Sequence, residues 1–195
     1  MNKLREYLSE NSLITNKDAK ALGYSRQLLA KLNKNGTLER LKRGVYLTKN
    51  SIVDDFALIS SNSKRVIFSH HTALFLHDLS DRVPNVFHIS VPQGYNASHL
   101  KKRYPNLIVH YINKELYEIG KETVKTPLGN MVAIYDVERT ICDMIIDREK
   151  IDKQIFTDCL IRYFNSSNKD LRRLIKYSKQ FKIENVIRKY MEVLS

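Results

Sequence analysis

The 195-residue sequence has little of what several protein classes require. Two cysteines, no tryptophan and no signal-like start argue against a disulfide-stapled secreted domain. Six glycines and four prolines are too few for collagen or for a Pro/Gly low-complexity chain. No apolar run approaches the roughly 18 residues of a membrane-spanning helix. Because 43% of the residues are hydrophobic, we expect a globular protein with a core. Together with the absences above, this predicts a cytoplasmic protein that does not associate with membranes. Cys142 and Cys159 lie on apolar stretches and are predicted to be buried thiols.

Positive charge is in excess and is concentrated near the N-terminus. Lys and Arg number 33 against 21 Asp and Glu, which gives a formal net charge of +12. Residues 1–50 hold 7 Lys and 4 Arg against 4 acidic residues, so they carry +7 of that total. This excess indicates a polyanionic partner, nucleic acid before a membrane surface. The polar segment 48–51 predicts a boundary between a domain of residues 1–50 and a domain of residues 52–195.

The pattern of residues 1–50 predicts three short helices and a β-hairpin. Apolar positions repeat at helical spacing, a capping box starts at Thr15, and Gly36 stands where a left-handed residue ends a helix. Two short apolar runs flank the basic turn Lys42-Arg43-Gly44. The expected elements are helices over 2–10, 15–22 and 26–35 and strands over 38–41 and 45–48. This order is that of a winged helix-turn-helix.

The third helix and the hairpin carry residue types that bind double-stranded DNA. Residues 27, 30, 31 and 34 share one helix face, away from the leucines. Arginine and glutamine read base edges, lysines contact phosphates, and the hairpin would act as the wing. The candidate DNA-binding residues are Ser25, Arg26, Gln27, Lys31, Lys34, Arg40, Lys42 and Arg43. The alternative is a small helical packing module with a solvated basic face.

Residues 52–195 are predicted to form a mixed α/β domain that ends in a C-terminal helical array. Strands are expected over 86–91 and 107–112, and Asp136 is expected to cap a helix through Ile146. The apolar pattern of the last 45 residues predicts three amphipathic helices. In the C-terminal one of these helices, apolar residues recur at i, i+3, i+4 and i+7. The fold class is therefore α+β, with a winged helix-turn-helix followed by the mixed domain.

Two groups of residues in the second domain suggest chemistry, and both have a plainer interpretation. Six histidines invite a metal site, and His70 and His77 could align on one helix face, but no ligand motif accompanies them. We therefore expect structural or surface histidines, with no metal and no cofactor. Asp136, Glu138 and Asp143 could hold Mg²⁺ in a nuclease, but helix capping and a buried ion pair explain them better. No nucleophile with its base is evident, so no enzymatic activity is predicted.

Three blocks of the sequence resemble the AbiEi-type antitoxins of bacterial abortive-infection systems. The hairpin block is Leu41–Tyr46, and it follows a leucine-rich third helix. The other two are Phe68–Leu79, FSHHTALFLHDL, and Tyr135–Asp143, YDVERTICD. His71 and Thr72 depart from the pattern, in which an acid and a serine are expected. The resemblance covers nearly the whole chain.

The resemblance implies a bacterial protein with two tasks in a type IV toxin–antitoxin system. Its winged helix would bind inverted repeats in the promoter of its own operon and repress it. Its C-terminal domain would neutralise a co-encoded nucleotidyltransferase-like toxin without needing a stable complex, and so limit phage spread. The resemblance implies no catalytic residue. The alternative is a plain winged-helix transcriptional regulator with a sensing C-terminal domain.

Overall fold

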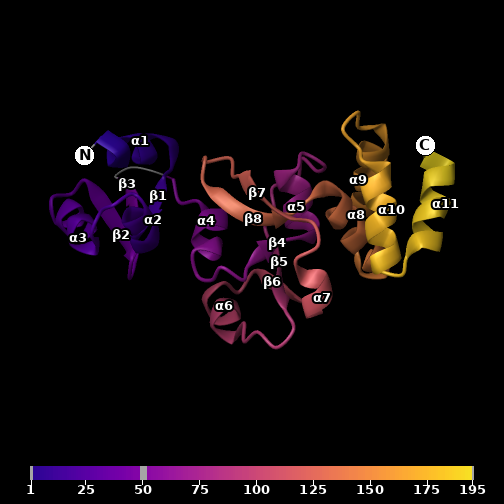
Figure 1. Ribbon diagram of the computed structural model, residues 1–195, viewed down its shortest axis with the longest axis horizontal. Helices are drawn as coiled ribbons and strands as arrows, with labels where there is room; N and C mark the ends of the chain where they lie inside the picture. Colours follow the sequence, from indigo (N-terminus) through magenta and orange to yellow (C-terminus); the bar gives the residue numbers. More distant parts are fainter. Residues whose placement is uncertain (1, 49–51, 195) are drawn as a thin grey trace. The chain divides into compact units, whose positions relative to one another are not determined.

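The computed structural model describes residues 2–48 and 52–194 (Figure 1). Contacts within the chain divide it into two compact units. The first comprises Met1–Lys64 together with Lys125–Val132, and the second comprises Arg65–Val124 together with Ala133–Ser195. Three residues of the predicted boundary segment, 49–51, lie outside the described residues.

The first unit begins with the predicted order of elements. Its six leading elements are α1 (Asn2–Glu10), β1 (Leu13–Thr15), α2 (Asn16–Ala21), α3 (Arg26–Lys34), β2 (Leu38–Lys42) and β3 (Val45–Thr48). β3 pairs antiparallel with both neighbours, so the small sheet has the order β1-β3-β2. The three helices and the hairpin confirm the sequence prediction. β1 was not predicted, because three residues are too few to show an alternating pattern.

Local signals in the sequence set the helix ends of this unit. The Thr15 hydroxyl accepts from the backbone N–H of Asp18, whose carboxylate accepts from the backbone N–H of Thr15, which completes the capping box. The hydroxyl of Ser25 accepts from the N–H of Leu28 at the start of α3. Gly36, with φ of +72°, follows the last turn of α3 in the left-handed conformation. The buried core between these elements consists of Leu4, Ile14, Ala19, Leu29, Leu38 and Tyr46.

A buried polar network holds the remaining parts of the first unit together. These parts are α4 (Asp55–Ser60) and the segment that joins two later strands, Lys125–Val132. Asp54 caps α4 by accepting from the N–H of Ala57, and its other oxygen accepts from Thr126 and from the amide of Asn130. The Asn130 amide also donates to Ser12. Residues far apart in sequence therefore complete the first unit.

Most of a five-stranded mixed sheet lies at the centre of the second unit, since only the strand ends at Lys125 and Met131–Val132 belong to the first. Its strands are β4 (Ile67–Phe68), β5 (Phe87–Pro92), β6 (Leu107–Ile112), β7 (Lys121–Lys125) and β8 (Met131–Tyr135), in the order β6-β5-β4-β8-β7. β4 is antiparallel to β5 and parallel to β8, and β5 is parallel to β6 with Ser90 opposite His110. Two short helices that the sequence did not predict, α6 (Ser98–Arg103) and α7 (Lys114–Tyr117), follow β5 and β6.

Helices make up the rest of the second unit (Figure 1). They are α5 (His70–Leu76), α8 (Val137–Ile146), the 3-10 turn Arg148–Lys150, α9 (Lys153–Asn165), α10 (Leu171–Gln180) and α11 (Glu184–Leu194). α8 packs against α5, α9 and α10, and α11 packs against α9 and α10. The predicted cap is confirmed, since Asp136 accepts from the N–H of Arg139. The α+β class and the C-terminal helical array are confirmed. None of the described helices is long and apolar enough to cross a membrane.

Candidate functional site

Helix α3 has one buried face and one exposed face. Leu29 is fully buried in the core of the first unit. The exposed side chains of the helix include Arg26, Gln27, Ala30, Lys31 and Lys34. The helix contains no acidic residue, so every charged side chain on its exposed face is cationic. Its nine residues span about 13 Å, a length that a DNA major groove accommodates.

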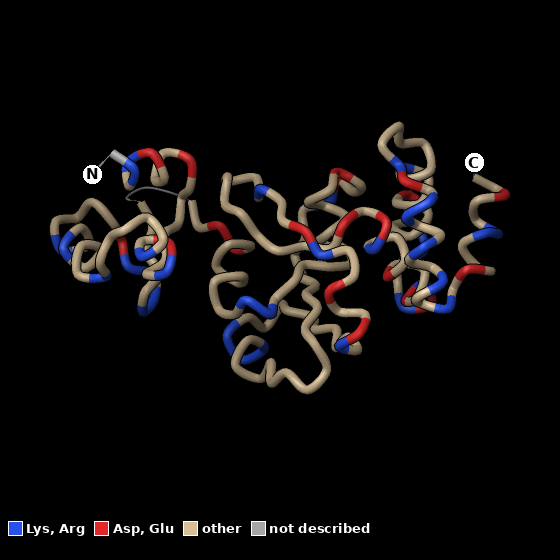
Figure 2. The backbone as a smooth tube through the Cα atoms, in the orientation of Figure 1, with Lys and Arg blue, Asp and Glu red and all other residues tan. Residues whose placement is uncertain are grey.

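The three basic residues of the hairpin lie in different surroundings. Arg43 is exposed in the turn, and Arg40 is exposed on β2 with its Nε donating to the carbonyl of Lys42. The Lys42 ammonium is only partly exposed, since it donates to the carbonyl of Leu58 at 3.4 Å and to Asn62 Oδ1 at 2.9 Å. Lys42 therefore links the hairpin to α4. Figure 2 shows Lys and Arg along α3 and in the β2–β3 hairpin.

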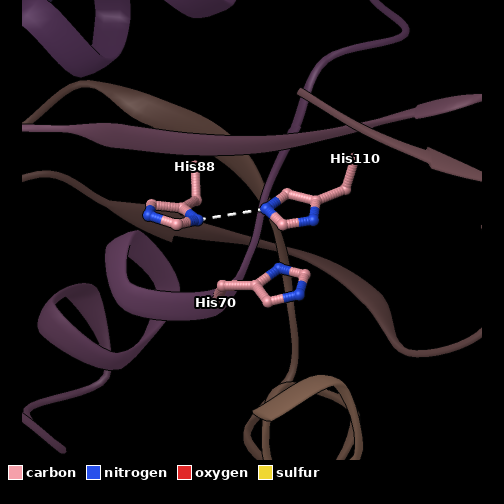
Figure 3. A group of neighbouring side chains, drawn as sticks. All are labelled: His70, His88 and His110. Atoms are coloured by element: carbon pink, nitrogen blue, oxygen red, sulfur yellow. Dashed lines mark hydrogen bonds between the residues drawn. The ribbon is translucent and has the colours of Figure 1, made fainter. Parts of the chain in front are cut away.

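Four histidines form a cluster in the second unit. His70 and His71 begin α5, His88 lies on β5, and His110 lies on β6. His71 Nδ1 is 3.1 Å from His88 Nε2, and His88 Nδ1 is 3.0 Å from His110 Nε2. The rings of His70 and His110 stack with their centroids 3.6 Å apart. Figure 3 shows His70, His88 and His110 converging from three elements.

One carboxylate completes this cluster. Asp147 follows α8, and its Oδ2 lies 3.2 Å from His70 Nε2 and 3.7 Å from His110 Nδ1. The hydrogen bond from His70 is the largest cause that holds the pKa of Asp147 below its usual range. Burial, and then the neighbouring imidazoles, lowers the pKa of His88 and of His110 to about 3. Both rings are therefore neutral at pH 7.

The pair of histidines that the sequence suggested is not brought together as a site. His77 Nε2 instead lies 2.8 Å from the carbonyl of Tyr135 and 3.7 Å from Glu122. Sequence spacing missed the cluster because its members lie on three separate elements. The one available signal was the alternation of β5 and β6, which places His88 on a single face of its strand.

The three carboxylates that a nuclease would need are held in structural roles. Asp136 caps α8 with Oδ1 and accepts from the Tyr177 hydroxyl with Oδ2. Glu138 accepts from the backbone N–H of Asp170 at 2.9 Å and lies 3.5 Å from Arg173. These contacts agree with the interpretation as helix capping and ion pairing, which the sequence favoured.

The third carboxylate of that group, Asp143, pairs with a fully buried arginine. Its Oδ1 accepts from the Nε of Arg139 at 3.0 Å. Another guanidinium nitrogen, Nη1, donates to the carbonyls of Leu116 and Ile119 at 2.7 and 3.1 Å. The pair thus joins α8 to the segment before β7, and it explains why the YDVERTICD block contains both charges.

The comparison with protein families concerns the N-terminal module, which contains α3 and the hairpin. Residues 2–49 match the family described as "Transcriptional regulator, AbiEi antitoxin". The N-terminal module is therefore similar to AbiEi-type domains. The match covers α1 to β3, and the two C-terminal blocks that suggested the same family lie outside the matched residues.

The comparison with solved structures concerns the fold of nearly the whole chain. The chain is similar to the crystal structure of the RV2827C protein from Mycobacterium tuberculosis, with a TM-score of 0.55 and 12% identity. The similarity covers 90% of this chain and 69% of that chain, and it supports the fold alone. No curated protein sequence matches this chain significantly.

The matched N-terminal module carries all eight residues that the sequence nominated for DNA binding. Seven of them are exposed, and Lys42, which is tied to α4, is the exception. Ser25 lies at the first turn of α3, where its hydroxyl serves as the cap. Contacts of these residues with DNA stay a prediction.

Proposed function

We propose that this protein is the antitoxin of a bacterial type IV toxin–antitoxin system and represses its own operon. The observation that supports repression best is the exposed, acid-free face of α3 on a module similar to AbiEi-type domains. In this proposal the protein works in the cytoplasm, with the nucleoid when bound to its operator. It acts by binding and carries no catalytic residue.

The DNA-binding half of the proposal assigns a role to each exposed side chain. α3 lies in the major groove, where Arg26 and Gln27 at its N-terminal end face base edges. Lys31 and Lys34 contact phosphates along the groove. Arg43 in the hairpin turn contacts the backbone beside it. One module covers one half-site, so inverted repeats in the promoter bind two copies.

Binding to the promoter at several salt concentrations tests these roles. Arg43→Ala should reduce the slope of log affinity against log salt by about 0.9, because one phosphate contact is lost. Lys42→Ala should change that slope less, because its ammonium already bonds to α4. Arg172→Ala, an exposed change on α10, is the matched control. Equal slopes for Arg43→Ala and the control contradict the placement of the wing.

Base recognition needs a separate variant. Gln27→Ala should alter the preference among operator variants by about 1–3 kcal/mol at the base that it contacts. A measurement across single-base operator variants identifies that base. If Gln27→Ala binds every operator variant as the wild type does, the recognition face is not the one assigned here.

The antitoxin half of the proposal is tested by rescue of growth. The adjacent gene is induced in the presence of the full chain or of a full-length variant with Arg26→Ala, Gln27→Ala and Lys31→Ala. A full-length variant is preferable to a truncation, because Asn130 and Asp54 tie the region after residue 52 to Ser12. Rescue by both proteins, with promoter repression by the wild type alone, supports an antitoxin with separable tasks. Rescue by neither refutes the antitoxin half.

The second candidate is a plain winged-helix regulator. The family description that matches residues 2–49 names a transcriptional regulator as well as an antitoxin, and only the regulator role needs the exposed face of α3. This candidate predicts operator binding without any rescue, and no toxin gene beside its own. The rescue experiment therefore separates the two candidates.

A further inference from the structure

The histidine cluster presents a set of nitrogen ligands that spacing along the sequence does not reveal. His70, His88 and His110 each offer one ring nitrogen, and these three atoms lie within 4.8 Å of one another (Figure 3). We propose that these three histidines bind a divalent transition-metal ion, with Zn²⁺ as the ion that fits best. The proposal is independent of the DNA-binding and antitoxin functions.

The closest nitrogen pair already has nearly the separation that an ion requires. His88 Nδ1 and His110 Nε2 are 3.0 Å apart. Two nitrogens bound to tetrahedral zinc at 2.0–2.1 Å lie about 3.3 Å apart. An ion would therefore replace this hydrogen bond after the two rings move apart by a few tenths of an ångström. The third ring, His70, needs a rotation of its side chain, because it now stacks on His110.

Each of the three rings has its other nitrogen held by a neighbour. Asp147 Oδ2 contacts Nε2 of His70 and Nδ1 of His110, and His71 Nδ1 contacts Nε2 of His88. An ion would therefore bind Nδ1 of His88 and Nε2 of His110, which now contact each other, and Nδ1 of His70, which now lies 3.1 Å from the Ser69 hydroxyl. Metal-binding histidines in proteins are oriented in this way, by a carboxylate or another acceptor on the second nitrogen.

The strained backbone at His70 indicates that the fold requires an imidazole at this position. His70 has φ of +48°, in the left-handed region that residues other than glycine rarely adopt. Such a conformation is strained and persists only where the surroundings impose it. The ring of His70 is also buried, with Nδ1 3.1 Å from the hydroxyl of Ser69. An unusual backbone thus holds a buried imidazole against two others.

The donor set favours zinc over the common hard cations. Three imidazoles suit zinc and its neighbours in the first transition row, whereas Mg²⁺ and Ca²⁺ prefer oxygen ligands. A three-histidine site leaves a fourth position, which water can fill.

Calorimetric titration of the chelator-treated full-length protein with ZnCl₂ tests the proposal. We expect one ion per chain for the wild type. His110→Gln and His88→Gln should each weaken binding more than about 100-fold, and His71→Gln about 10-fold, since it only orients His88. His99→Gln removes an exposed histidine outside the cluster and should bind as the wild type does.

Titration with Co²⁺ keeps the test independent of how well the variants fold. In the wild type, intense visible absorption bands of tetrahedral cobalt are expected, whereas a hydrated octahedral ion absorbs weakly. Circular dichroism shows whether each variant is folded. The absence of binding to the wild type, or equal affinity of folded His110→Gln and His99→Gln, overturns the proposal.

Discussion

Substitution of Arg139 by methionine should destabilise the second unit strongly. The side chain is fully buried on α8. Its guanidinium carbon lies 4.1 Å from the centroid of the Tyr135 ring and 4.2 Å from that of Phe181, between the two aromatic faces. The same group donates to Asp143 and to two backbone carbonyls. Methionine keeps most of the apolar stem but donates no hydrogen bond.

The size of the effect follows from the groups left behind. Asp143, only 4% exposed, would keep a buried charge without its cation. Removal of one partner from a buried ion pair costs about 3–5 kcal/mol. With a urea dependence of about 2 kcal/mol/M, the unfolding midpoint should fall by roughly 1.5–2.5 M.

Urea unfolding of the full-length chain, followed by circular dichroism, measures this change. Arg172→Met is the matched control, because Arg172 is exposed on α10, and it should change stability by less than about 0.5 kcal/mol. The double variant with Asp143→Leu should lose less than the sum of the single losses, because both charges are then gone. A loss below about 1 kcal/mol for Arg139→Met refutes the assigned role of the pair.

Three further outcomes are expected. Burial raises the pKa of the Cys159 thiol to about 12 and raises that of the Cys142 thiol further still. A disulfide reagent at pH 8 should therefore label neither cysteine until the protein is unfolded. Labelling of the native protein would contradict the burial of the two thiols. Gly120→Ala places a Cβ 2.6 Å from the Cβ of Arg139 and should lower the stability measured in urea. Gly94→Ala is the control and should lose less, because Gly94 also has a positive φ, +85°, but has open space around it. Equal losses for the two variants argue against the close contact. Thr15→Ala removes the capping box of α2 and should cost about 1 kcal/mol, whereas Thr15→Ser should restore most of it.

Much of the local structure was predictable because it depends on neighbours in the chain. The caps at Thr15 and Asp136 and the left-handed Gly36 act within one helical turn, and each lies where the sequence placed it. The last helix was also predictable from its periodicity, because its apolar residues recur at regular helical spacing. The elements missed were the short ones, β1, α6 and α7, which tertiary packing rather than pattern selects.

The candidate DNA-binding face was predictable for the same reason. Exposure of Gln27 and Lys31 follows from helical spacing once Leu29 is assigned to the core. Lys42 was not predictable, since its partners at Leu58 and Asn62 lie beyond the domain boundary that composition suggested. Charge in a sequence shows that a lysine is available, but not whether the fold gives it a partner.

By itself, then, the sequence determined the class of fold, the winged helix and the excess of positive charge on it, because these depend on local pattern and composition. Only the tertiary structure decided where the histidines meet. His70, His88 and His110 come from α5 and from two parallel strands, and strand pairing brings them together across 18 and 22 positions of the chain. It also decided that Arg139 is buried, because the aromatic rings and carbonyls around it come from three separate segments. Long-range packing is the physical cause in both cases, and no spacing along the chain encodes it.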